Sequence, residues 1–178
     1  MPITCKYSSD ITLEEKIYNF KQVLTIQSFI LLARPKHIVY KSEAAKKIFI
    51  QDLNSLIESG LLIVEIPWVD NAHWLDLMSD VRSKFPHLQL GSASLINKKS
   101  IDDSLKLNLN FSMMRTWDKD LYIYSKKNNY LLIPGMTTIK DLKEAILHKC
   151  CTIKIFPVAN KDILLDINKY NQISFVGA

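Results

Sequence analysis

The sequence predicts an α/β protein whose strands are parallel, and three observations support this prediction. Short apolar segments of β-like composition recur along the chain, and from Leu90 onward they return about every 21 residues, the length of one compact strand-helix unit. The stretches between them carry apolar residues at helical spacing. The β-like segments contain almost no charged residues, as expected of parallel strands that are buried on both faces.

Seven segments are predicted to be strands. In chain order they are residues 29–32, 62–66, 88–90, 110–113, 130–133, 152–155 and 173–176. A closed TIM (β/α) barrel needs eight strands, and the last predicted strand ends just before Gly177. We therefore expect an incomplete barrel of about seven strands, which would come either from a truncated chain or from a shortened member of this fold class.

Helices are predicted in the intervals. One at about residues 12–24 lies ahead of the first strand, begins with a capping box of Thr12 and Glu15, and could close the floor of the barrel. Apolar residues at three and four spacing predict another over residues 44–59, with Gly60 as its stop.

Three further helix starts are indicated by capping residues. Asp70 or Asn71 can cap a helix that follows them. Ser100 and Thr138 are each followed by an aspartate three residues later, which is a capping-box pattern. Helices are therefore predicted to begin at Ser100 and at Thr138.

Composition limits the class of protein. A chain of 178 residues with 48% hydrophobic side chains can bury one sizeable core, so a single domain over residues 1–178 is expected. No apolar run approaches the roughly 20 residues that span a bilayer, and the N-terminus lacks a secretory signal pattern, which favours a cytoplasmic protein. The charge of +5 comes from scattered Lys and Arg, so nucleic-acid binding is not expected. The histidines and cysteines lack metal-ligand spacing, so neither a metal nor another cofactor is expected.

Lys154 is a charged residue inside an otherwise apolar predicted strand. Strand alternation places Ile153 and Ile155 on one side and Lys154, with Thr152 and Phe156, on the other. Burial would disfavour the ammonium and lower its pKa, leaving the neutral amine that imine formation requires. The structural alternative is a lysine at the edge or rim of the sheet.

Glu65 is the second charged exception, near the C-terminal end of a predicted strand, where the active sites of (β/α) barrels gather. A carboxylate there could move protons, or it could be a structural partner for a lysine or a backbone amide. Lys154 and Glu65 together form the minimal set for an imine-forming aldolase, because the amine creates an electron sink and the carboxylate moves protons at the neighbouring carbon.

Two motifs resemble a known family. Residues 131–138 read L-L-I-P-G-M-T-T, and 16 residues after Thr138 the chain reads K-I-F-P from Lys154. This pattern is similar to the I-P-G-x-x-T segment and the K-x-F-P motif of the 2-keto-3-deoxy-6-phosphogluconate (KDPG) / 4-hydroxy-2-oxoglutarate (KHG) aldolase family. The resemblance covers roughly residues 28–178, with an apparent insertion near residues 35–42. It implies a TIM barrel, class I aldolase chemistry and a homotrimer.

The resemblance also assigns roles to residues. It makes Lys154 the imine-forming lysine and Glu65 the general acid/base. Ser94 stands where the family has a threonine in G-A-G-T, and Arg34 resembles the arginine after the first strand. The candidates for substrate binding are Ser94, Arg34, Arg115, Phe156 and Thr138.

The chain also departs from the family pattern. Val69 replaces the arginine of the family's E-V-T-x-R segment, and Arg115 lies where the family has an S-P-G turn. Arg115 could restore a positive charge from another direction. The family's glycine-rich phosphate loops are absent, so a phosphorylated substrate is not expected.

The sequence thus predicts a lyase that cleaves a 2-oxo acid reversibly into pyruvate and an aldehyde through an imine on Lys154. The main alternative is a catalytically impaired barrel that serves binding or assembly, which Val69 and the short C-terminus favour. A third is a decarboxylase or dehydratase that uses the same lysine. The expected partners are a small 2-oxo acid and further copies of the chain, which would cover an open sheet edge.

Overall fold

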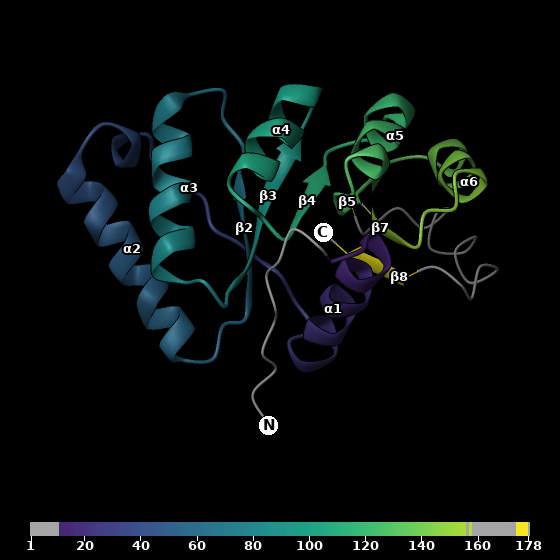
Figure 1. Ribbon diagram of the computed structural model, residues 1–178. Helices are drawn as coiled ribbons and strands as arrows, with labels where there is room; N and C mark the ends of the chain where they lie inside the picture. Colours follow the sequence, from purple (N-terminus) through teal and green to yellow (C-terminus); the bar gives the residue numbers. More distant parts are fainter. Residues whose placement is uncertain (1–10, 156, 158–173, 178) are drawn as a thin grey trace.

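The computed structural model describes residues 11–155, 157 and 174–177, in which helices and strands alternate (Figure 1). The helices are α1 (Leu13–Ile26), α2 (Glu43–Glu58), α3 (Ala72–Lys84), α4 (Lys98–Lys106), α5 (Lys119–Lys127) and α6 (Ile139–Leu147), with a 3-10 helix η1 (His37–Tyr40) in the expected insertion. The strands are β1 (Leu31–Leu32), β2 (Ile63–Pro67), β3 (Gln89–Leu95), β4 (Phe111–Met114), β5 (Leu132–Ile133), β6 (Gly135–Met136), β7 (Thr152–Ile155) and β8 (Ser174–Gly177).

All strand pairs in the described residues are parallel. They form a five-stranded sheet of order β1-β2-β3-β4-β5 and a three-stranded sheet of order β6-β7-β8. Among these strands β1 pairs only with β2 and β8 only with β7, so the sheet does not close. The prediction of an α/β fold with an incomplete parallel barrel is confirmed.

The number of strands differs from the prediction. Eight strands are described instead of seven, because Gly135–Met136 forms a separate strand after residues 132–133. Pro134 lies between them and has no backbone N–H to donate, so it interrupts the ladder. Its carbonyl oxygen accepts a hydrogen bond from the backbone N–H of Lys154 at 2.8 Å, which joins this break directly to β7.

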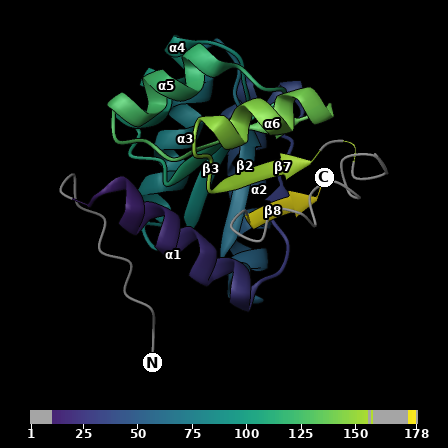
Figure 2. The ribbon, with the colours of Figure 1, turned by 90° about the vertical axis from the view of Figure 1, so that its right-hand side faces the viewer.

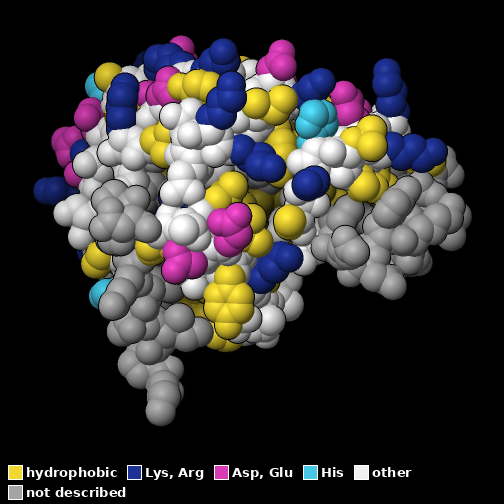
Figure 3. All heavy atoms as spheres, turned by 45° about the vertical axis from the view of Figure 1, so that its right-hand side comes forward, with side chains coloured by type: hydrophobic (Ala, Val, Ile, Leu, Met, Phe, Trp, Pro, Cys, Tyr) yellow, Lys and Arg dark blue, Asp and Glu magenta, His cyan; other side chains and the backbone are white. Residues whose placement is uncertain are grey.

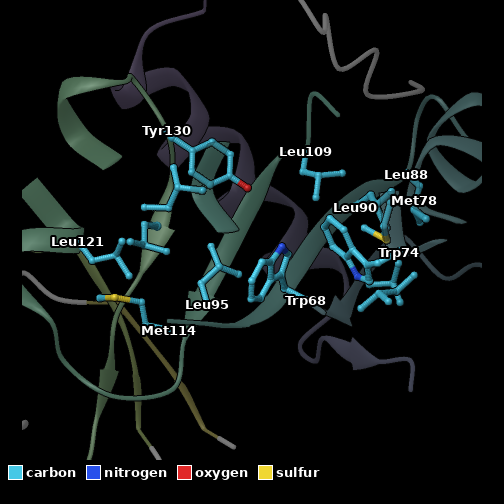
Figure 4. Packing of buried hydrophobic residues seen from close by; sticks show 14 of the residues in the cluster. Trp68, Trp74, Met78, Leu88, Leu90, Leu95, Leu109, Met114, Leu121 and Tyr130 are labelled. Carbon is cyan, nitrogen blue, oxygen red and sulfur yellow. The ribbon is translucent and has the colours of Figure 1, made fainter. Parts of the chain in front are cut away.

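Helices α2 to α6 cover the outer face of the sheet, and α1 lies on the other side (Figures 1 and 2). The outer core is built from alternate strand residues such as Val64, Ile66 and Leu90 together with helix residues. Trp74 is fully buried beside Met78, and Figure 4 shows how these side chains fill the layer between sheet and helices. Burial of aromatic side chains of this size contributes much of the stability of such a layer.

A smaller inner core lies between the sheet and α1. Phe20 and Val23 of α1 pack with Ile63, Phe111 and the other inward residues of β2 to β5. Polar contacts hold both ends of α1 at the N-terminal ends of strands. Lys16 Nζ donates to the carbonyl oxygen of Asn129, ahead of β5, at 2.6 Å. Gln27 Oε1 accepts from the N–H of Leu62, ahead of β2, at 2.7 Å. Helix α1 therefore closes one end of the open barrel.

The helix starts follow the predicted capping chemistry with one exception. Thr12 with Glu15 and Thr138 with Asp141 form capping boxes, and the side chain of Asn71 caps α3. The prediction that a helix begins at Ser100 is wrong. Asn97 caps α4, and Ser100 is its third residue, whose hydroxyl completes the box from inside the helix.

Two of the apolar residues whose three and four spacing predicts this helix, now α2, are not buried. Ile48 is 58% exposed and Leu56 is 46% exposed, although Leu53 on the same helix is buried. These side chains lie on the outer surface near the edge strand β1. Ile48 lines one pocket together with Arg34, and Leu56 lines another together with Leu31 of β1. In the part of the chain that the structure describes, no helix is long and apolar enough to cross a membrane.

Candidate active site

A pocket of about 590 Å³ opens on the inner side of the strands, beside the edge strands β1 and β8. Its polar side chains include Arg34 after β1, Glu65 of β2 and Lys154 of β7. The volume lies within the range of about 300–1,000 Å³ that is usual for small-molecule sites. The pocket is thus the natural place to look for a ligand.

Strand alternation explains why Glu65 and Lys154 meet there. Val64 and Ile66 point into the outer core, so Glu65 between them points inward. Ile153 and Ile155 are likewise in the outer core, and Lys154 faces the pocket. Both residues come near the C-terminal ends of parallel strands, where (β/α)-type folds place their active sites.

Burial and charge shift the two groups in opposite directions. Burial raises the pKa of the Glu65 carboxyl, an effect that the charges of Lys154 and Arg34 oppose. Burial also lowers the pKa of the Lys154 amine; the Glu65 carboxylate opposes this shift and Arg115 adds to it. The result is a more readily neutral amine next to a more readily protonated acid, the pattern of a general acid/base pair.

Glu65 keeps one oxygen available. The side chain is 8% exposed, and Oε2 has no hydrogen-bond partner among the described residues. Its backbone is firmly held, since the carbonyl oxygen of Glu65 accepts from the N–H of Ala33 at 2.9 Å. A buried carboxyl oxygen without a partner costs free energy unless a ligand or water satisfies it.

Gly135 allows the chain around Lys154 to pack closely. It lies opposite Lys154 in the β6–β7 register. A Cβ on Gly135 would lie 2.3 Å from the carbonyl oxygen of Arg115 and 2.8 Å from that of Met114. Only glycine permits this approach of two backbone segments, which explains the glycine of the I-P-G-M-T-T segment and brings Arg115 near Lys154.

The other candidate residues divide into three groups. Arg34 lines the pocket, and Arg115 is exposed but close enough to act on the charge of Lys154. Ser94 lies in a bulge of β3 with a φ of 60°, and Thr138 is an exposed helix cap; neither is among the pocket-lining residues. Phe156 lies outside the described residues.

Sequence reasoning did not find the apolar part of the pocket. It is lined by Leu24, Phe29, Ile30, Leu32, Met113 and Val176. The alternation of Ile30, Leu32 and Arg34 along the first strand could have indicated that these three share one face. The position of Leu24 depends on how α1 packs, which no local pattern reveals.

The described residues contain no group of three or more His, Cys, Asp or Glu side chains that could hold a metal ion. Figure 3 shows one face of the molecule, on which hydrophobic, basic and acidic side chains are interspersed.

The fold and pocket define a class: an open, parallel (β/α) barrel with an amine and a carboxyl at the C-terminal ends of its strands. Solved structures of aldolases share this fold. A KDPG aldolase from Legionella pneumophila, with pyruvate captured as a covalent carbinolamine, is 18% identical with a TM-score of 0.70, over 84% of this chain and 70% of that one. The aldolase of Zymomonas mobilis ZM4 with 3-phosphoglycerate is 17% identical with a TM-score of 0.73, over 90% of this chain and 74% of that one.

The fold expected from the sequence resemblance is thus confirmed by the structural comparison. No family model matches the sequence, and no curated protein matches it significantly. The likeness is one of fold.

Proposed function

We propose that this protein is a class I aldolase that cleaves a 2-oxo acid reversibly into pyruvate and an aldehyde, as a divergent relative of the KDPG/KHG aldolases. One observation carries the proposal: Lys154 and Glu65 share one pocket, and burial shifts their pKa values toward each other. The carbinolamine in the Legionella aldolase is the same class of adduct that an amine at Lys154 would form.

In the proposed reaction the neutral amine of Lys154 attacks the C2 carbonyl of a 4-hydroxy-2-oxo acid, and the carbinolamine loses water to give a protonated imine. The Glu65 carboxylate accepts the proton of the C4 hydroxyl, the C3–C4 bond breaks, and its electron pair moves into the imine to form an enamine. The aldehyde leaves. The enamine takes a proton at C3 from Glu65, and water then hydrolyses the resulting imine to pyruvate and free Lys154.

The substrate carboxylate would be held by arginine. Arg34 lines the pocket, and Arg115 lies close to Lys154. Planar guanidinium groups bind carboxylates through paired hydrogen bonds, and both side chains are exposed enough to reorient toward a ligand. These arginines would take the place of the one that Val69 replaces.

The test is reductive trapping. The protein is incubated with pyruvate and borohydride, and the added mass is located by peptide mass spectrometry. We expect the adduct on Lys154 and its loss in Lys154→Met. Lys16→Met is the matched control, because Lys16 is also partly buried with a lowered pKa but lies on α1, outside the lining of the pocket.

Glu65→Gln separates binding from proton transfer. We expect this variant to retain the pyruvate adduct and to lose turnover of 4-hydroxy-2-oxo acids by about 10²–10⁴-fold, the usual contribution of a positioned acid/base. Absence of any adduct in folded wild-type protein, beside an active control aldolase, would exclude the aldolase and leave a binding or assembly role for the barrel.

We also propose that the chain forms homo-oligomers, with a trimer expected from the family resemblance. Exposed apolar residues near the unpaired strand β1, including Phe29, Ile48 and Leu56, support self-association. Sedimentation velocity of wild type and of Ile48→Lys/Leu56→Lys tests it. A wild-type monomer at micromolar concentration would contradict the proposal.

A further inference from the structure

We propose that the preferred substrates are 2-oxo acids with an apolar tail, which lies in the hydrophobic half of the pocket. This inference rests on the aldolase function proposed above and specifies its substrate class. It is carried by the lining of the pocket. Leu32 and Val176 lie level with Glu65 and Lys154, and the part toward α1 is lined by Leu24, Phe29 and Ile30, with Ser28 as its only polar side chain among the described residues.

The pocket has a polar end and an apolar end. Ile30, Leu32 and Arg34 lie at alternate positions of one extended segment and all line the pocket. At a rise of about 3.3 Å per residue, the segment from Arg34 to Ile30 spans about 13 Å. Leu24 of α1 lies beyond, since α1 packs on the floor of the barrel. Arg34, Glu65 and Lys154 would thus bind the reacting end of the substrate, and the tail of the substrate would extend toward α1.

The remaining apolar walls come from the neighbouring strands. Met113 of β4 lines the pocket and is 1% exposed. Val176 of β8, opposite Lys154 in the ladder, lines it from the other edge. Among the described lining residues no Lys or Arg lies toward the α1 end. A phosphate in that position would be desolvated without a cation, whereas methylene groups would gain from leaving water.

The size of the pocket supports the same substrate class. Pyruvate fills only a small part of about 590 Å³. The structure of the Zymomonas aldolase contains 3-phosphoglycerate. Apolar side chains such as those of this pocket offer no hydrogen-bond donors to a phosphate group of that kind. With Lys154 attached to C2, carbons beyond C4 would lie against Leu32, Ile30 and Leu24, so cleavage of the C3–C4 bond would release an apolar aldehyde and pyruvate.

The experiment is borohydride trapping of the full chain at graded concentrations of pyruvate, 2-oxobutanoate, 2-oxopentanoate, 2-oxohexanoate and 2-oxooctanoate. Each acid can form the same imine by loss of one water. We expect the half-saturating concentration to fall on the order of threefold for each methylene added. A flat or rising series with a normal pyruvate adduct overturns the tail site alone. No adduct with any acid overturns the aldolase function and the tail site together.

Two variants locate the tail. In Leu24→Gln we expect the preference for 2-oxooctanoate over pyruvate, taken as the ratio of their half-saturating concentrations in the same variant, to fall at least threefold. Ile26→Gln is the matched control, since Ile26 lies on the same helix, is 59% exposed and does not line this pocket. If Leu24→Gln fails to fold, Ile30→Gln, at a half-buried lining position, serves the same purpose. Longer acids that bind both lining variants as well as wild type contradict the placement.

Discussion

Gly91 provides a quantitative test of how the floor of the site is packed. It lies opposite Glu65 in β2 and opposite Phe111 in β4. A Cβ on Gly91 would lie 2.4 Å from Cζ, 2.5 Å from Cε2 and 2.7 Å from Cε1 of the Phe111 ring. Carbon atoms prefer separations of about 3.5–4.0 Å, so the ring would have to retreat by about 1 Å or more.

The ring has little room to retreat. Phe111 is fully buried, and its centroid lies 4.9 Å from that of Phe20 on α1. Overpacking of a core costs about 1–3 kcal/mol, and we expect Gly91→Ala to lower the free energy of unfolding by this amount. Urea denaturation followed by circular dichroism measures it. Because all three clashing atoms belong to the ring end, Phe111→Leu should relieve the clash.

The double variant therefore tests the mechanism. We expect Gly91→Ala/Phe111→Leu to be more stable than the sum of the single changes predicts, by about 1–2 kcal/mol. Gly135→Ala with Arg115→Ala is the matched comparison, because the atoms closest to Gly135 belong to backbone that no side-chain change removes. That pair should be additive. Additivity of the Gly91 pair within about 0.5 kcal/mol would refute the reasoning.

Three further predictions concern charge and capping. In pyruvate trapping against pH, the midpoint for Lys154 should move to higher pH in Arg115→Gln and to lower pH in Glu65→Gln, because Arg115 lowers and Glu65 raises the amine pKa; shifts of equal sign would contradict the pairing. Because the folded pKa of Glu65 is raised, wild type loses stability as pH rises from the unfolded value through the folded one. Glu65→Gln lacks this loss. Urea denaturation should therefore show that the free energy of unfolding of the variant rises relative to that of the wild type as pH increases through this window, and that the difference between the two is constant at higher pH. Thr138→Ala should cost about 1 kcal/mol as a lost cap and leave pyruvate trapping unchanged; a weaker adduct would indicate that Thr138 contacts the ligand.

Much of the fold could be predicted from local patterns. The capping boxes of Thr12 and Thr138 appear as predicted, because capping depends on residues within one helical turn. The predicted start at Ser100 is wrong since Asn97, three residues earlier, caps the helix by accepting a hydrogen bond from the N–H of Ser100, which places Ser100 inside the first turn. The break at Pro134 was also missed, although the residue that causes it is visible in the sequence.

In the candidate site, too, some features follow from neighbouring residues and others from packing between distant segments. Lys154 and Glu65 stand out in the sequence because each is a charge within an apolar strand, and strand alternation then decides which way each points. Whether the two share a pocket depends on curvature of the sheet across several strand pairs. The apolar half of that pocket depends on α1, which is held by contacts such as that between Lys16 and Asn129, far apart in the chain.

By itself, the sequence determined the α/β class, the parallel strands, most helix starts and the two charged strand residues that face the pocket, because these follow from period, capping and the cost of burying charge over a few neighbouring residues. Only the tertiary structure decided that the sheet stays open between β1 and β8, that Arg34 and not Thr138 lines the pocket, and that the space beyond Lys154 is apolar. These properties arise from packing between segments distant in sequence, and the free energy of such packing is not expressed in any local pattern.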